Sequence, residues 1–109
     1  MSFKILFMGT PNFAVPILKT LYNSNHKILE IYTQPPKKKN RGQKISFSPI
    51  HEYSKEIDVP VRHPITIDTI EEFEHIKKIK PDIAVVVAYG KILPSKFLDL
   101  KNTMFINIH

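Results

Sequence analysis

Residues 82–88 constrain the fold of this chain more than any other segment. Positions 83–87 read IAVVV, without the alternation of apolar and polar residues that marks a strand with one face in water. A strand that is apolar on both faces is typical of a parallel sheet covered from both sides. We therefore predict a parallel sheet with helices packed on both of its faces.

Strand-like and helix-like segments alternate along the whole chain. Strands are expected at 3–8, 27–33, 59–61, 82–88 and 104–109, and each is joined to the next by a segment with helical spacing, the last at 94–98. This alternation, with right-handed crossovers, indicates a Rossmann-like α/β fold with strand order 3-2-1-4-5, incomplete at its carboxyl end. The 109 residues are expected to form a single domain, 1–109.

The predicted helices carry recognisable start signals. Pro16 is expected in the first turn of its helix, where a missing N–H group costs nothing. Ser48 is expected to cap the second helix with Pro49 as its first residue, and Asp68 with Glu71 resembles a capping box for the third. The residues predicted to face the core are Ala14, Ile17, Leu18, Leu21, Ile50, Tyr53, Ile57, Ile70, Phe73, Ile76 and Ile79.

The composition excludes several classes of protein. The chain has no cysteine, which rules out disulfides and thiolate metal sites, and we expect no metal. No run of residues approaches the ~20 apolar residues of a membrane span, and the amino end does not resemble a signal peptide, so we expect a cytoplasmic protein. Gly9 lacks the further glycines of a dinucleotide-binding fingerprint, and we expect no nucleotide cofactor.

Positive charge is concentrated in residues 34–47, which hold five of the cations that give the chain its net charge of +6. We predict an irregular loop of a length that is unusual in a compact domain. It could clamp the phosphate backbone of a nucleic acid or be a solvated basic loop, and the charge alone favours neither. These cations are Lys37, Lys38, Lys39, Arg41 and Lys44.

The last predicted strand, 104–109, carries two polar residues that could perform chemistry. It reads as a buried strand in which Asn107 and His109, two positions apart, point to the same side. Ligands of open parallel sheets bind at the carboxyl ends of the strands, where an amide and an imidazole could stabilise an oxyanion and move a proton. On spacing alone, the alternative that two polar residues merely end a strand stays open.

Several segments match one family together and in the same order. The chain resembles the amino-terminal part of the methionyl-tRNA formyltransferases. The segments that carry the resemblance are MGTPNFAVP at 8–16, TQP at 33–35, RG at 41–42, SP at 48–49, VVVAYGKILP at 85–94 and INIH at 106–109.

The resemblance implies transfer of a formyl group from 10-formyltetrahydrofolate to the amino group of methionyl-initiator-tRNA, by an enzyme that is monomeric at full length. It implies that Asn107 and His109 are two members of an Asn-His-Asp catalytic set, and that the basic loop, Lys37, Lys38, Lys39, Arg41 and Lys44, engages the acceptor stem of the tRNA. The residues implied to help form the folate pocket are Tyr89, Gly90, Lys91, Ile92 and Leu93.

The sequence also departs from the family pattern. It ends at His109, before the family's Ser-Leu-Leu-Pro segment, its distal aspartate and its carboxyl-terminal tRNA-binding barrel. Asp82 and Asp99 do not replace that aspartate, because they lie at the opposite end of the sheet and in a crossover. We therefore expect the 109-residue polypeptide alone to lack activity. The alternatives are a non-catalytic RNA-binding remnant and a sugar-amine formyltransferase of the same fold.

Overall fold

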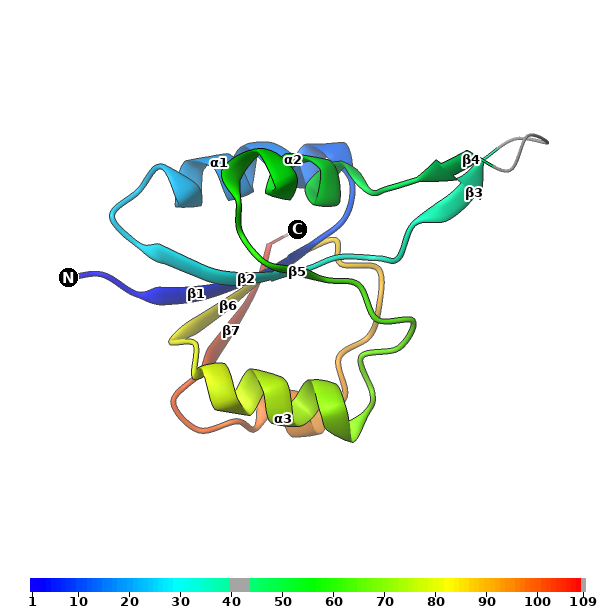
Figure 1. Cartoon of the computed structure of the whole chain (residues 1–109). Coiled ribbons are helices and arrows are strands. Elements are labelled where there is room, and N and C mark those ends of the chain that lie inside the picture. The colour runs from blue at the N-terminus through cyan, green and yellow to red at the C-terminus, as the bar shows by residue number, and fades with distance from the viewer. Residues whose placement is uncertain (40–43, 109) are drawn as a thin grey trace.

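The computed structural model describes residues 1–39 and 44–108 (Figure 1). A five-stranded parallel sheet runs in the order β5-β2-β1-β6-β7. Counted along the chain, these five strands have the order 3-2-1-4-5, so the predicted α/β topology is confirmed. The strands are β1 (Lys4–Gly9), β2 (Lys27–Tyr32), β5 (Val61–Arg62), β6 (Ile83–Val87) and β7 (Met104–Ile108).

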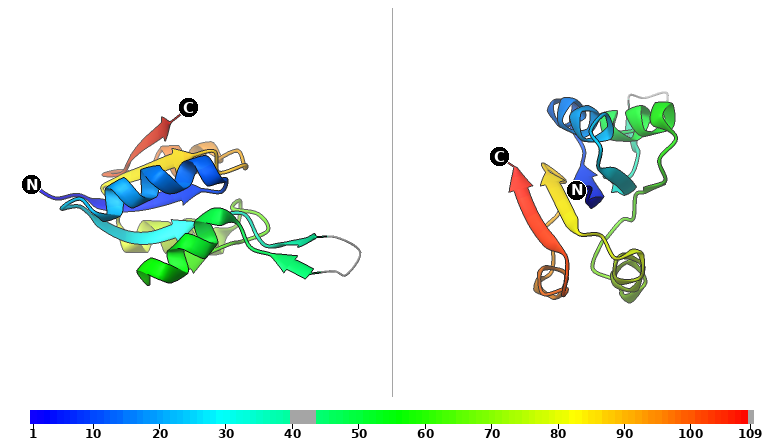
Figure 2. Two further views of the ribbon diagram at one scale, coloured as in Figure 1. Left: turned by 90° about the horizontal axis from the view of Figure 1, so that it is seen from above. Right: turned by 90° about the vertical axis from the view of Figure 1, so that its left-hand side faces the viewer.

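Helices lie on both faces of this sheet, as predicted (Figures 1 and 2). On one face lie the 3-10 helix η1 (Asn12–Ala14), α1 (Val15–Tyr22) and α2 (Pro49–Ile57), and on the other α3 (Ile70–Ile79) and α4 (Ser95–Leu98). The chain builds the sheet outward from β1 in two directions. Right-handed crossovers therefore place the helices of the two halves on opposite faces. None of the helices in the described residues is long and apolar enough to cross a membrane.

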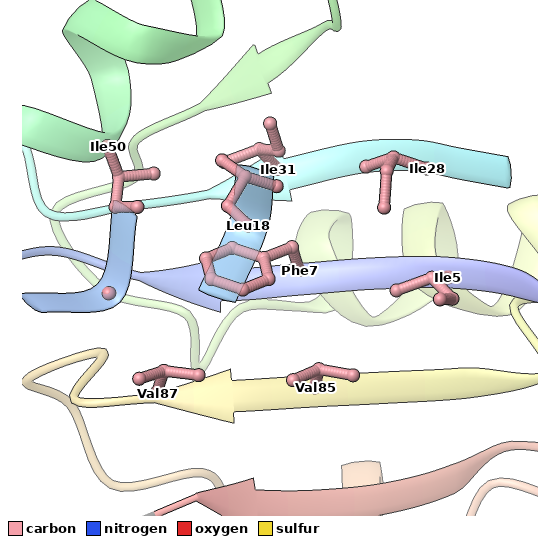
Figure 3. Close-up of a cluster of buried hydrophobic side chains, with 9 residues drawn as sticks. Ile5, Phe7, Leu18, Ile28, Ile31, Ile50, Val85 and Val87 are labelled. Atoms are coloured by element: carbon pink, nitrogen blue, oxygen red, sulfur yellow. The ribbon is translucent and has the colours of Figure 1, made fainter. Parts of the chain in front are cut away.

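Two hydrophobic clusters, one on each face, explain why residues 83–87 do not alternate. Val85 and Val87 face α1 and α2, and Ala84 and Val86 face α3 and α4. Figure 3 shows the first cluster, in which Leu18 of α1 lies over Phe7 at the centre of the sheet. β6 is thus an inner strand with apolar residues on both faces, as the sequence indicated.

The helix start signals are confirmed at two helices and wrong at the third. Ser48 caps α2 by accepting a hydrogen bond from the His51 backbone N–H (3.0 Å), and Pro16 lies in the first turn of α1. At α3 the cap is Thr69, which accepts from the Glu72 N–H at 3.2 Å, so the predicted Asp68 box is wrong. The helix starts one residue later than Asp68 would require.

Ile70 does not face the core, contrary to prediction, and its side chain is 77% exposed. The inward face of the first turn of α3 is occupied by Glu72 instead, which is buried together with Ile76 one turn later. Ile70 lies about 200° around the helix from Glu72 at the usual ~100° per residue, and therefore points to solvent.

β7 is paired with β6 along its whole length, from Met104 beside Ile83 to Ile108 beside Val87. It is an edge strand among the residues described, as the predicted strand order implied. The prediction that it is buried is wrong. Met104 is 64% exposed and Ile106 is 39% exposed. Its apolar sequence is therefore only partly covered.

The described part of the basic segment is more regular than the irregular loop that the sequence predicted. It contains an antiparallel hairpin of β3 (Lys37–Lys39) and β4 (Lys44–Ser46), with Lys38 opposite Ile45. The backbone N–H and C=O groups of the two strands hydrogen-bond to each other. The charge of this segment gave no signal for that pairing. Arg41 lies outside the described residues.

The predicted strand 59–61 is also displaced, to Val61–Arg62, since Pro60 has no N–H to donate.

A buried carboxylate joins β2, β5 and α3. Glu72 accepts hydrogen bonds from the Tyr32 hydroxyl (2.6 Å), from Arg62 Nε (2.8 Å) and from Arg62 Nη2 (3.1 Å). Burial would raise the pKa of Glu72, but the hydrogen bonds from Arg62 and Tyr32 outweigh it and hold this pKa below its ordinary value. Burial, reinforced by Glu72, raises the pKa of Tyr32. The network therefore holds a charged pair on the α3 side of the sheet.

Candidate active site

Four parallel strands end along one edge of the sheet. β1 ends at Gly9, β2 at Tyr32, β6 at Val87 and β7 at Ile108. The residues that follow these strands line the edge, which is where ligands bind in open parallel sheets. This carboxyl edge is the candidate site, and every segment predicted to carry function reaches it or projects from it.

A hydrogen-bonded hub, formed by Thr10, Gln34 and the backbone of Tyr89, holds three of these loops together. Thr10 Oγ1 donates to the Tyr89 carbonyl (2.9 Å), and Gln34 Nε2 donates to the same carbonyl (2.9 Å). The backbone N–H of Gln34 donates to Thr10 Oγ1 at 3.3 Å. Both residues lie in segments that resemble the family, but sequence reasoning gave neither of them a role. Their contacts fix the edge before any ligand binds.

The turn after β6 needs unusual backbone conformations. Ala88 has φ 49° and Gly90 has φ 91°, both in the left-handed region. A Cβ atom at Gly90 would lie 2.9 Å from Gln34 Nε2. Glycine is therefore required at position 90 both for its backbone angle and for the close approach of Gln34. The turn brings the Tyr89 carbonyl to the hub.

The five residues predicted to form the folate pocket are placed in different surroundings. The Tyr89 side chain packs in the cluster on the α3 side and is 1% exposed, and Leu93 packs against the same cluster. Lys91 Nζ donates to the Ile65 carbonyl at 2.6 Å, whereas Ile92 is 93% exposed. Only part of this segment is therefore available on the surface, and its role in folate binding stays a prediction.

Tyr89 is an unusual buried phenol. Its hydroxyl is buried and has no hydrogen-bond partner within the part of the chain that the structure describes. Burial raises the pKa of Tyr89 to about 12, with a smaller contribution from the charge of Glu72. The phenol is therefore neutral at physiological pH, and it faces the core rather than the edge.

One of the two predicted catalytic residues, Asn107, lies near the end of β7. Asn107 is exposed and stands in register with Val86. By strand alternation it shares the α3 side of the sheet with Phe105. His109 lies outside the described residues, so the prediction that the two side chains share a face stays a prediction. Asn107 lies two strands away from β1 and its hub.

The basic hairpin β3–β4 projects from the carboxyl edge, away from the body of the protein (Figures 1 and 2). Lys37, Lys38 and Lys44 are exposed on it. A pocket of about 320 Å³ lies at its base. The pocket is lined by Thr10, Gln34, Pro35, Lys37, Lys38, Ser46, Phe47, Ser48 and Pro49. The hairpin and the hub thus share one concave surface.

Phe47 and His51 form an aromatic contact beside this pocket, with ring centroids 4.7 Å apart. Lys55 Nζ lies 4.2 Å from the centre of the Phe47 ring. Burial, and then the charges of His63 and Lys55, lower the pKa of His51. His51 is therefore neutral near pH 7, and sequence reasoning gave no signal for it.

No group of three or more His, Cys, Asp and Glu within residues 1–39 and 44–108 could hold a metal ion.

Comparison with known proteins identifies the family. A model of the formyl transferase family matches residues 3–109. The chain belongs to the formyl transferase family. The resemblance predicted from the sequence motifs is therefore confirmed.

Among curated proteins, this formyl transferase chain is similar to several methionyl-tRNA formyltransferases. The one from Pelagibacter ubique (strain HTCC1062) is 52% identical over 110 residues, covering 100% of the chain and 36% of the relative. Those from Rickettsia bellii (strain RML369-C) and Sulfurihydrogenibium sp. (strain YO3AOP1) are 50% and 48% identical, each over 97% of the chain. They are covered over 35% and 34% of their own length. The chain thus spans about a third of the length of these relatives.

Proposed function

We propose that this chain supplies the amino-terminal part of a cytoplasmic methionyl-tRNA formyltransferase. Its donor would be 10-formyltetrahydrofolate and its acceptor the amino group of methionyl-initiator-tRNA. One observation carries the proposal. The whole chain matches a methionyl-tRNA formyltransferase with 52% identity. The arrangement of the carboxyl edge, with a basic hairpin projecting from the edge where Asn107 lies, supports it.

The proposed reaction is acyl transfer. The methionyl amine attacks the formyl carbon, and negative charge develops on the formyl oxygen. A new C–N bond forms as the bond between the formyl carbon and the folate nitrogen breaks, and the amine proton passes to that nitrogen. The Asn107 amide and the His109 imidazole would donate hydrogen bonds to the developing oxyanion. The proposed folate-binding residues are Tyr89, Gly90, Lys91, Ile92 and Leu93.

A chimeric enzyme tests the catalytic proposal. Residues 1–109 replace the aligned third of the Pelagibacter ubique enzyme, and formyl-methionyl-tRNA formation is measured. We expect an active chimera, in which Asn107→Ala lowers kcat by roughly 10²–10³, the usual cost of removing one oxyanion donor. Asn25→Ala, a matched change at an exposed Asn far from the edge, should leave kcat unchanged. A folded chimera without activity, or equal activity of the two variants, would contradict the proposal.

The 109-residue polypeptide by itself is expected to be inactive in the same assay. Asn107 lies in an edge strand of the described residues, and a preorganised site needs its groups held within ~0.5 Å. Formyl-methionyl-tRNA formed by the purified 109-residue polypeptide would refute this expectation.

We propose further that the hairpin binds the acceptor stem of the tRNA through Lys37, Lys38, Lys39, Arg41 and Lys44. Exposure of Lys37 and Lys38 on a projecting hairpin favours this role. Replacing both by Ala should weaken tRNA binding and reduce the slope of log K against log salt by about two. The matched pair Lys77→Ala and Lys78→Ala, exposed on α3, should leave the slope unchanged. Equal effects of the two pairs would refute the hairpin contact.

The alternative function, RNA binding without catalysis, differs in one measurable respect. It predicts the same loss of RNA affinity in the Lys37→Ala, Lys38→Ala double variant. It also predicts that the chimera carrying residues 1–109 neither binds folate nor transfers a formyl group. Folate binding by the chimera therefore separates the two functions.

A further inference from the structure

The Gln34 side chain joins two segments of the carboxyl edge that are proposed to bind different substrates. Gln34 lies two residues beyond β2, and Pro35 and Pro36 follow it before β3 begins at Lys37. Its Nε2 donates to the Tyr89 carbonyl (2.9 Å), at the start of the turn proposed to bind folate. One side-chain amide therefore connects this turn to the segment that leads into the basic hairpin.

Hydrogen bonds and close packing both fix Gln34 against the turn. Thr10 Oγ1 donates to the same Tyr89 carbonyl (2.9 Å) and accepts from the Gln34 backbone N–H (3.3 Å), so the three groups close a ring. A Cβ atom added at Gly90 would lie 2.9 Å from Gln34 Nε2 and 3.4 Å from Gln34 Cδ. The amide thus lies directly against the backbone of the turn.

The connection from Gln34 to the lysines of the hairpin is short and stiff. The two residues between Gln34 and Lys37 are both proline, which fixes its own φ and restricts the residue before it. Thr33 Oγ1 and Ser48 Oγ share a hydrogen bond of 2.6 Å, which ties this arm to the segment that leaves the hairpin. Lys37 and Lys38 line the same pocket as Gln34. A shift of Gln34 would therefore move these lysines relative to the turn.

Formyl transfer joins atoms of two substrates, so its rate depends on how the two binding sites are placed relative to each other. We propose that Gln34 is a positioning residue, whose amide holds the lysines of the hairpin at a fixed place relative to the turn 89–93. The proposal rests on the proposed function, which assigns folate to this turn and tRNA to the hairpin. Gln34 acts through the Tyr89 carbonyl and not by contact with a reacting atom.

Two variants of similar shape separate the hydrogen-bond donor from the bulk of the side chain. Gln34→Met keeps the length of the side chain without the amide, and Gln34→Glu places a carboxylate, which cannot donate, against the Tyr89 carbonyl. In the chimera carrying residues 1–109, we expect kcat per folded molecule to fall by roughly tenfold or more for Gln34→Met, because small misplacements of reacting groups are costly. The fall should be larger for Gln34→Glu.

The division of the effect between kcat and KM distinguishes positioning from substrate contact. For both Gln34 variants, kcat should fall by a larger factor than KM for tRNA rises. The Lys37→Ala, Lys38→Ala double variant should show the reverse, since its lost groups are proposed to contact the tRNA directly.

Thr103→Val is the matched control. Thr103 Oγ1 donates to the Pro81 carbonyl at 2.6 Å, which is also a partly buried bond from a side chain to a backbone carbonyl. It lies at the amino ends of β6 and β7, away from the carboxyl edge. This variant should leave kcat per folded molecule unchanged. Circular dichroism gives the folded fraction of every variant.

A second measurement needs no substrate. The chain has no cysteine, so Lys44→Cys on the hairpin and Ile92→Cys in the turn give two unique sites for spin labels, both of them exposed. Electron paramagnetic resonance then measures the distribution of distances between the hairpin and the turn in the 109-residue chain. We expect a broader distribution when Gln34→Met is added, and no broadening when Thr103→Val is added.

Two results would overturn the positioning role. One is a distance distribution that Gln34→Met leaves unchanged, and the other is a kcat that falls equally for Gln34→Met and Thr103→Val. A broadened distribution together with a wild-type chimera that transfers no formyl group would support the link between hairpin and turn. That result would count against the proposed function alone, so the two failures are distinguishable.

Discussion

Replacing Glu72 by Gln tests the buried network between β2, β5 and α3. The substitution keeps the shape of the side chain and one acceptor oxygen, and it turns the other oxygen into an NH2 group. Both carboxylate oxygens accept hydrogen bonds, Oε1 from Tyr32 and Arg62 Nε, and Oε2 from Arg62 Nη2. Whichever way the amide turns, its NH2 group faces a donor. The variant therefore loses the ion pair and at least one charged hydrogen bond.

The expected cost is about 2–3 kcal/mol at pH 7. A hydrogen bond to a charged group contributes roughly 1.5–3 kcal/mol, and breaking a fully buried pair costs roughly 3–5 kcal/mol. The Arg62 side chain is 30% exposed and can regain water, which places the cost below that upper range. For a domain of this size, such a loss lowers Tm by about 10 °C.

The effect should depend on pH with a definite sign. The pKa of Glu72 is depressed in the folded protein, chiefly because hydrogen bonds from Arg62 and Tyr32 outweigh the effect of burial. Its contribution to stability is therefore present above the unfolded pKa of about 4.3 and is lost as the pH falls through the folded value. The difference between the wild type and Glu72→Gln should shrink steadily below about pH 4.3.

Urea unfolding of the 109-residue chain at pH 7 and at several lower pH values measures both quantities. Glu71→Gln is the control, because Glu71 makes the same type of contact to Arg62 at 3.6 Å but its side chain is 80% exposed. That variant should change the free energy of unfolding by less than ~0.5 kcal/mol. Equal losses for the two variants, or a Glu72→Gln loss that does not depend on pH, would refute the reasoning.

Four further predictions concern stability and titration of the chain. Leu18→Ala, at a fully buried site over the sheet, should lower the free energy of unfolding by about 2–5 kcal/mol in urea titrations, and an effect under ~1 kcal/mol would contradict the packing. Gly90→Ala should cost about 1–3 kcal/mol, and adding Gln34→Ala should relieve part of it, because the new Cβ would meet Gln34. Tyr89→Phe should change stability by less than ~1 kcal/mol or raise it, since the hydroxyl has no partner among the described residues. The phenol of Tyr89 should ionise near pH 12. In a titration followed by ultraviolet absorbance, the wild type should show this step and Tyr89→Phe should lack it.

Residues that are far apart in the sequence lie close together at the carboxyl edge. Thr10 follows β1, Gln34 lies just beyond β2, and Tyr89 follows β6, yet one carbonyl joins all three. The same hub borders the pocket at the base of the hairpin. A ligand bound in this pocket would therefore meet Thr10 and Gln34, which come from two loops and donate to the same Tyr89 carbonyl.

The sequence alone determined the topology of this protein. The apolar run 83–87 indicated a parallel strand covered on both faces, and the alternation of strands and helices with right-handed crossovers favoured the order 3-2-1-4-5, which the structure has. Ser48 and Pro49 marked the start of α2 because capping is a local interaction. The motifs also identified the family, as the match over residues 3–109 confirms.

Tertiary structure alone decided which side chains are buried and what they contact. Ile70 reads as a core residue but is exposed, while the charged Glu72 is buried because Tyr32 and Arg62, distant in sequence, satisfy its oxygens. Likewise the apolar sequence of β7 reads as buried, but Ile106 is 39% exposed. Local patterns indicate whether a segment forms a helix or a strand, and where that element ends. The partner on each face depends on segments brought together only when the sheet forms, and that information is not contained in any one stretch of the chain.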